Sequence, residues 1–208
     1  MKNEERKMKS SDRHRPRFLR GRTALALIIF HFSFFIFHFP ATAQHRSDAL
    51  DDVLQHVPMA TVFALKAFDV DNATPWTELT LTAVAAYAAG VAVTYPTKQL
   101  IGERRPDKSD HRSFPSGHAM FAFAGATMLS HEFGHASPWV TIGGYGLATL
   151  VSADRLVRDR HYLHDFCAGA AIGIGATELV YWLKKRLIKN DNVDLSFTGQ
   201  SLSLAVRW

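Results

Sequence analysis

Residues 113–129 read SFPSGHAMFAFAGATML, a short polar start followed by an apolar run. Proline and serine are common where a helix begins, because a serine side chain can accept a hydrogen bond from an unpaired backbone N–H. Alanine, methionine, leucine and phenylalanine dominate Ala119–Leu129 and favour a helix there. The stretch therefore predicts a capped helix with His118 in its first turn. Backbone N–H groups near Ser116 and Gly117 would suit a bound phosphate.

Three further stretches predict helices around this one. Leu79–Thr97, Ala136–Ala153 and Phe166–Thr177 contain no formal charge and are rich in alanine. Their lengths lie near the membrane-spanning threshold, but threonine, tyrosine and glycine dilute them. We therefore expect an all-α fold, a compact helical bundle of buried helices, with membrane-spanning helices as the alternative. The last residues alternate with period two on either side of Gly199, which predicts a short C-terminal β-hairpin.

The net positive charge of the chain comes from its N-terminus. The chain has 24 Lys or Arg and 19 Asp or Glu. Nine of these basic and three of these acidic residues lie in 1–22, and 23–43 has none, so 44–208 carries 15 basic and 16 acidic residues. A nucleic-acid-binding domain needs a basic surface on its folded part, so we expect no nucleic-acid partner. The single cysteine, Cys167, excludes an internal disulfide and a zinc site built from several cysteines.

The first 43 residues have the order of a secretory signal peptide. A basic stretch precedes the apolar run TALALIIFHFSFFIFHF, and the small-residue sequence Ala41-Thr42-Ala43 follows it. We expect 1–43 to be a signal peptide, with an uncleaved N-terminal anchor as the alternative. The remainder divides into one helical domain, 44–190, and a C-terminal tail, 191–208. The protein is then exported, to the periplasm or cell envelope, with association with the membrane left open.

Two more blocks contain charged residues at helical spacing. Lys98 and Arg105 are seven residues apart, which would place them on one face of a helix that Pro106 ends. Two cations on one face can hold an anion. His161 and Asp165 are four residues apart, so their side chains can meet on a helical face. A carboxylate bonded to one ring nitrogen leaves the other nitrogen as a nucleophile or base.

Together the blocks resemble the type 2 phosphatidic acid phosphatase and vanadium haloperoxidase superfamily. Its motifs are K-x6-R-P, P-S-G-H and S-R-x5-H-x3-D, and this chain matches their order and spacing from Lys98 to Asp165. The resemblance continues into the following helical stretch, where Cys167-Ala-Gly169 is similar to the family's small residues. One position departs: Asp154 stands where the family has serine before Arg155. We expect the Asp154 side chain to face away from a bound phosphate.

The resemblance implies a phosphatase that acts through a phosphohistidine and needs no metal or other cofactor. His161 would attack phosphorus, Asp165 would orient its ring, and His118 would protonate the leaving oxygen and then activate water. The residues implied to hold the phosphate are Lys98, Arg105, Ser116, Gly117 and Arg155. The implied substrates are lipid-linked phosphates such as phosphatidic acid, a polyprenyl diphosphate or a phosphorylated glycolipid. A broad-specificity periplasmic acid phosphatase, acting on small phosphate esters, is the alternative.

Two other enzyme classes also match features of the sequence. His131-Glu132-Phe133-Gly134-His135 matches H-E-x-x-H, the zinc metallopeptidase pattern. The segment lies at the end of the predicted helix, whereas metallopeptidases place it in mid-helix. A vanadium haloperoxidase would use the same pocket as the phosphatase, although the chain is short for that group. The basic residues of Lys184–Lys189 could rest on an anionic membrane surface, or could be a solvated helix end.

Overall fold

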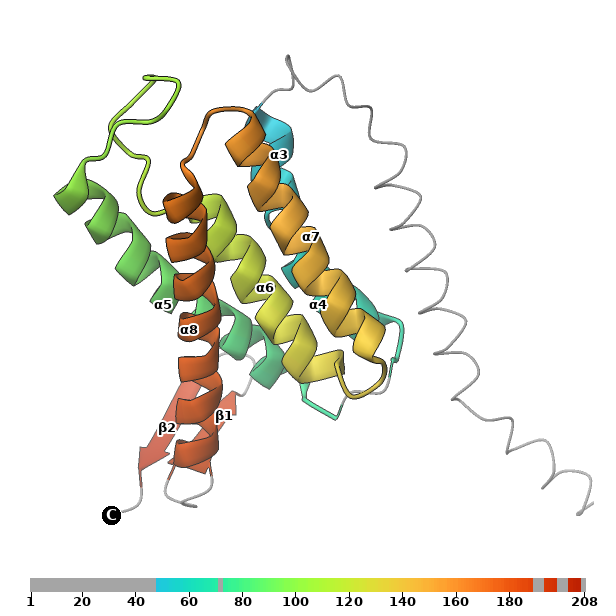
Figure 1. Ribbon diagram of the computed structural model, residues 1–208. Coiled ribbons are helices and arrows are strands. Elements are labelled where there is room, and N and C mark those ends of the chain that lie inside the picture. The colour runs from blue at the N-terminus through green and yellow to red at the C-terminus, as the bar shows by residue number, and fades with distance from the viewer. Residues whose placement is uncertain (1–47, 71–72, 189–192, 198–201, 207–208) are drawn as a thin grey trace, which may run out of the picture.

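The computed structural model describes residues 48–70, 73–188, 193–197 and 202–206 (Figure 1). The signal-peptide or anchor segment expected over 1–43 lies outside these residues. The described part contains six helices and two strands. Their bounds are α3 Asp48–Leu54, α4 Val57–Ala67, α5 Trp76–Ile101, α6 Gly117–Phe133, α7 Pro138–Val157, α8 Leu163–Ile188, β1 Val193–Phe197 and β2 Leu202–Val206.

Local sequence explains where the main helices begin and end. Ser116 is the N-cap of α6, and its side chain accepts a hydrogen bond from the backbone N–H of Ala119. Ser137 caps α7 in the same manner, and Pro138 occupies the first position of that helix. Gly102 ends α5 because it adopts a left-handed conformation, with φ 59°, that other residues rarely take. The helices expected from the sequence, and the cap at Ser116, are confirmed.

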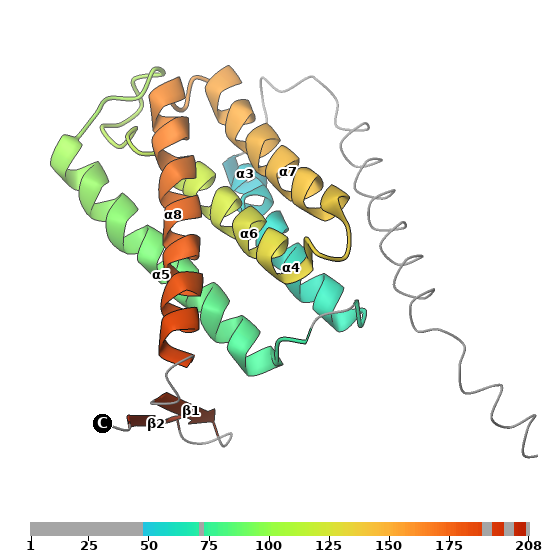
Figure 2. The same ribbon diagram turned by 60° about the horizontal axis from the view of Figure 1, so that its bottom comes forward.

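Helix α6 is the centre of the bundle, and α4, α5, α7 and α8 pack around it (Figures 1 and 2). Its contact face is made of small and apolar residues, so neighbouring backbones approach closely. A Cβ added at Gly125 would lie 3.1 Å from the Cβ of Met59 in α4. Methionine, leucine and phenylalanine side chains of α6 fill the core on the side of α4 and α5. The bundle is therefore all-α, as the sequence predicts, with four helices packed around α6.

Helices α5 and α8 expose much of their apolar surface, contrary to the expectation of buried helices. Both are long and apolar enough to cross a membrane by length and composition alone. Only 33% and 28% of their most apolar windows is buried within the protein. Large hydrophobic side chains such as Val84, Val93 and Leu100 of α5, and Leu179 of α8, are exposed. Threonine and tyrosine dilute these helices, but packing against α6 and against each other covers only part of their surface.

Strands β1 and β2 follow α8 and pair antiparallel, with Leu195 opposite Leu204. They lie where the period-two alternation predicts strands, and the expected turn around Gly199 falls outside the described residues. Two strands form no further layer of the domain. They lie near the C-terminal end of α8, away from the loops that join α5 to α6 and α7 to α8 (Figures 1 and 2).

Candidate active site

Two loops meet at one end of the bundle, 102–116 between α5 and α6 and 158–162 between α7 and α8. Hydrogen bonds tie them together: the backbone N–H of Asp107 donates to the carbonyl of Asp159 at 3.0 Å. The Arg160 guanidinium pairs with the Asp107 carboxylate at 2.8 Å. All three sequence blocks start, end or lie in these loops. Because loop 102–116 leads into α6, the contacts between the two loops bring residues of the third block close to the N-terminus of α6.

Lys98 lies in the last turn of α5, and its ammonium group reaches across to the start of α6. Its Nζ donates to the carbonyl oxygens of Arg112 at 2.9 Å and Pro115 at 2.5 Å. Arg105 lies in the following loop, where its Nε donates to Asp110 at 2.8 Å. The prediction that Lys98 and Arg105 share one helical face is therefore wrong, because Gly102 ends the helix between them. The loop, rather than helical periodicity, brings the second cation to the site.

His161 and Asp165 meet as predicted, but not on the face of one helix. Helix α8 begins at Leu163, so His161 belongs to the loop and Asp165 to the first helical turn. Nδ1 of His161 lies 3.3 Å from Oδ2 of Asp165, and both side chains are buried. The same carboxylate oxygen accepts hydrogen bonds from the Ser113 hydroxyl at 2.5 Å and the Tyr162 backbone N–H at 2.8 Å. This network fixes the position of the carboxylate. Because the carboxylate occupies Nδ1 of His161, Nε2 is the ring nitrogen that can react.

The start of α6 carries the second histidine, as the sequence predicts. Nε2 of His118 lies 3.0 Å from Oδ1 of Asp52, which comes from α3. Helix α8 packs directly on this turn: a Cβ added at Gly169 would clash with the Ser116 carbonyl oxygen. The backbone N–H of Ser116 donates to the carbonyl of Asp165 at 3.0 Å. The N-terminus of α6 is thereby held beside the His161–Asp165 pair.

Arg155 lies in the last turn of α7 and is almost fully buried, with 4% of its side chain exposed. Its NH1 donates to Oδ2 of Asp51 at 2.6 Å, and Arg158 donates to the same oxygen. Asp154, which replaces the family's serine, has its Oδ2 3.7 Å from NH1 of Arg158. The acidic residue beside Arg155 thus pairs with a neighbouring arginine.

The charges of these groups influence one another. Burial and the charge of Arg155 together lower the pKa of His118 to about 4, and Asp52 opposes both effects. His161 also acts on the pKa of His118. Burial likewise lowers the pKa of His161, while its hydrogen bond to Asp165 raises it and the charges of Lys98 and Arg105 lower it. Both histidines favour the neutral form while no anion is bound.

Sequence reasoning missed three residues of this centre. Asp51 and Asp52 come from α3, 104 residues before Arg155 and 66 residues before His118. No local pattern links them to either partner, so only the fold could find them. Ser113 stands in the quoted block but its hydrogen bond to Asp165 bridges 52 residues. The sequence shows a serine two residues before Pro115, but no local pattern indicates that this serine bonds to Asp165.

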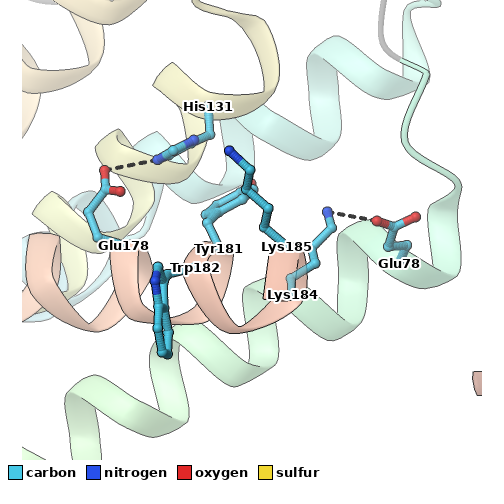
Figure 3. A pocket seen from close by; sticks show the side chains of 7 residues that line it. All are labelled: Glu78, His131, Glu178, Tyr181, Trp182, Lys184 and Lys185. Carbon is cyan, nitrogen blue, oxygen red and sulfur yellow. Dashed lines mark hydrogen bonds and ion pairs between the residues drawn. The ribbon is translucent and has the colours of Figure 1, made fainter. Parts of the chain in front are cut away.

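The H-E-x-x-H segment lies at the other end of α6. That helix ends at Phe133, so His135 falls beyond it and the two histidines do not share a helix. His131 pairs with Glu178 at 2.9 Å, and the Tyr181 hydroxyl donates to the buried Glu132 at 2.6 Å. Figure 3 shows His131 pointing toward Glu178 in a groove. The groove is lined by Glu78, His131, Glu178, Tyr181, Trp182, Lys184 and Lys185.

The arrangement at the N-terminus of α6 can hold an anion and transfer a group from it. Lys98 and Arg105 place positive charge near His161, and Arg155 places it near His118. The N-terminus of α6 lies beside these groups, and a helix N-terminus favours an anion. One histidine is bonded to a buried carboxylate and the other to an exposed one, with Asp52 62% exposed. Two histidines in different surroundings can serve as nucleophile and as acid.

Comparisons with known proteins show what the chain is similar to. A family model described as the PAP2 superfamily matches residues 79–189. A curated relative from Porphyromonas gingivalis, described as a lipid A 1-phosphatase, is 32% identical over 142 residues. The match covers 68% of this chain and 32% of the relative, so the chain spans about a third of that protein's length.

Two solved structures share the fold. One is described as Aquifex aeolicus LpxE, with a TM-score of 0.50 and 22% identity over 66% of this chain and 88% of that chain. The other is described as the first transmembrane PAP2 type phosphatidylglycerolphosphate phosphatase, from Bacillus subtilis. Its TM-score is 0.50 at 20% identity, over 81% of this chain and 97% of that chain. At these identities the two structures support the helical architecture alone.

Proposed function

The chain belongs to the PAP2 superfamily, and from this premise we propose that it hydrolyses phosphate esters or diphosphates through a phosphohistidine on His161. One observation carries the proposal. The buried pair of His161 and Asp165 lies beside a second histidine, His118, at a helix N-terminus that cationic side chains surround. Such an arrangement offers a nucleophile, an acid and positive charge for phosphoryl transfer.

In the first step, Nε2 of His161 attacks phosphorus and the bond from phosphorus to the leaving oxygen breaks. His118 donates its proton to that oxygen, so the bridging oxygen of the leaving alcohol or phosphate is protonated as it departs. Asp165 holds Nδ1 of His161 and stabilises the positive charge that the ring acquires. A neutral nucleophile is available because burial lowers the pKa of His161.

In the second step, His118, now neutral, takes a proton from water as the water attacks the phosphohistidine. The phosphorus–nitrogen bond breaks, phosphate is released and His161 returns to its neutral form. Lys98, Arg105 and Arg155 stabilise the charge on the equatorial oxygens in both steps. These three cations supply the electrostatic clamp for which other phosphoryl-transfer enzymes use metal ions.

The proposed substrate is a lipid-linked phosphate, and a phosphorylated glycolipid fits best. The relative that shares 32% identity is described as a lipid A 1-phosphatase. The apolar surfaces of α5 and α8 would lie among lipid chains, and the site lies at the end of the bundle where α5 ends and α8 begins. A lipid phosphate could then reach Lys98 from the membrane while its chains stay in the apolar layer.

Two measurements test this proposal. Phosphate release is compared for dioctanoyl and dioleoyl phosphatidic acid, for lipid A and for p-nitrophenyl phosphate, with His161→Ala as the control. The protein is also followed in soluble and membrane fractions after an alkaline wash. We expect lipid phosphates to be preferred and the protein to stay in the membrane. Equal rates on all substrates, with the protein in the soluble pool, would favour the broad-specificity acid phosphatase. Release that persists in His161→Ala would exclude both.

A further inference from the structure

Helix α3 brings two adjacent carboxylates to the catalytic centre, and neither belongs to the motifs. Asp51 is buried, with 3% of its side chain exposed, whereas Asp52 is 62% exposed. Neighbouring residues of a helix point in different directions, so the two carboxylates contact different partners. Asp51 pairs with Arg155 and Arg158 in and after α7, and Asp52 bonds to His118 in α6.

We propose that Asp52 is a positioning residue for the proton transfers of His118, and that Asp51 anchors the helix that presents it. The inference rests on the proposed phosphatase function. The two aspartates have separate tasks. Asp51 fixes α3 to α7, and Asp52 then lies 3.0 Å from Nε2 of His118.

The anchoring step follows from the burial of Asp51. A buried carboxylate is stable only when it is paired, and here it accepts hydrogen bonds from two guanidinium groups. The contacts join residues that are 104 and 107 positions apart. Since α3 has only seven residues, this buried contact determines where the helix lies relative to α7. It therefore also determines where the next residue, Asp52, can reach.

The positioning step follows from the groups that face His118. Arg155 from α7 and His161 from the following loop both disfavour a charged His118, as does burial. Asp52 from α3 is the acidic group that acts in the opposite direction. An imidazole bonded to a carboxylate at one nitrogen presents the other for proton exchange. Asp52 thus orients the ring of His118 in the way that Asp165 orients the ring of His161.

Other charged groups near the start of α6 have different partners. From α5, Lys98 donates to carbonyl oxygens of the loop before α6. From α8, Asp165 bonds to His161 and Ser113. His56, which precedes α4, bonds to Tyr87. Among these described groups, Asp52 is the carboxylate that contacts His118 directly.

The test compares Asp52→Asn, Asp52→Ala and Asp52→Glu in the full chain. Asp69→Asn is the matched control, because Asp69 is exposed after α4 and its φ of 57° is one that asparagine tolerates. The probes are p-nitrophenyl phosphate, whose leaving group needs little protonation, and dioctanoyl phosphatidic acid, whose leaving group needs a proton. Asp52 is exposed, so each variant should fold, and thermal unfolding checks this.

We expect Asp52→Asn to lower kcat on dioctanoyl phosphatidic acid about 10-fold or more, with little change in KM. The loss on p-nitrophenyl phosphate should be smaller, and the pH optimum should move to lower pH because His118 loses the group that favours its charged form. Asp52→Glu should recover part of the rate. Equal losses on both substrates with an unchanged pH profile would overturn the inference, as would wild-type kinetics in Asp52→Asn. An inactive wild-type protein would instead overturn the proposed function.

Discussion

Nδ1 of His161 lies 3.3 Å from Oδ2 of Asp165, and the Asp165 side chain is completely buried. The Ser113 hydroxyl and the Tyr162 backbone N–H donate to the same oxygen, so the carboxylate has little freedom to turn. A fixed acceptor at Nδ1 leaves Nε2 of His161 as the nitrogen that would face a bound phosphorus. The orientation of the proposed nucleophile is therefore set by a network that spans two loops and the first turn of α8.

Replacing Asp165 with asparagine tests this orientation. Asparagine preserves the size of the side chain but can donate to Nδ1, which favours the wrong tautomer and removes the stabilising charge. We expect kcat to fall by on the order of 10³-fold to 10⁴-fold, with a smaller change in KM. Steady-state kinetics on dioctanoyl phosphatidic acid measure both. A variant that retains more than about a tenth of the wild-type kcat would show that His161 is oriented without Asp165.

Replacing Lys98 tests whether the cationic side chains hold the phosphate. Its ammonium group is held by carbonyl oxygens of the loop before α6 and acts on the pKa of His161, so it lies within range of a phosphate bound there. We expect Lys98→Met to lower kcat/KM by roughly 100-fold to 1000-fold, the size of one lost electrostatic donor. Lys185→Met is the control, because Lys185 lies in the groove at the opposite end of α6. Equal effects of the two substitutions would place the phosphate elsewhere.

The lowered histidine pKa values predict an acidic pH optimum. His161 must be neutral to attack, and because its pKa is lowered from 6.5, that form persists below pH 6.5. His118 must carry a proton, and with a pKa of about 4 it loses that proton as the pH rises above this value. The two requirements place the maximum of kcat/KM on the acid side of 6.5. A profile from about pH 4 to pH 9, corrected for titration of the substrate, checks this. A maximum in the alkaline range would contradict the roles of the two histidines.

The packing of α8 on the start of α6 can be tested with alanine substitutions of two glycines in α8. A Cβ at Gly169 would meet the Ser116 carbonyl and lie 3.0 Å from the Cβ of Ala119, whereas one at Gly175 would meet nothing within 4 Å. We expect Gly169→Ala to destabilise the fold by about 1–3 kcal/mol and to lower activity, because Ser116 must move. Gly175→Ala should be neutral or stabilising by up to about 1 kcal/mol. Thermal unfolding of both variants measures the difference, and similar melting temperatures would show that the close approach does not constrain the site.

The helices could be predicted from the sequence because their signals are local. Ser116 caps α6, Ser137 and Pro138 begin α7, and apolar runs mark the interior of each helix. The end of α5 was predicted too late, since the spacing of Lys98 and Arg105 suggested a continuous helix. Gly102 overrides that periodicity, because a single residue in the left-handed conformation is enough to end a helix.

Much of the site could also be predicted, because motif residues recur at fixed spacing. The remainder depends on contacts between distant parts of the chain. Asp51 and Asp52 have no sequence signal, since their partners lie in α7 and α6. The exposed faces of α5 and α8 were also missed, because composition indicates how apolar a helix is but not how many neighbours cover it.

The most direct test of the central claim is to trap the phosphoryl group on the enzyme. A ³²P-labelled lipid phosphate is mixed with the protein and quenched in alkali, where phosphohistidine survives, and the labelled peptide is identified. We expect label on His161 in the wild-type protein and none in His161→Ala. With ³²P-labelled p-nitrophenyl phosphate, whose leaving group needs little protonation, His118→Ala should carry more label than the wild-type protein, because water is not activated in this variant. Phosphate release without any label on His161, or label on another residue, would contradict the proposed mechanism.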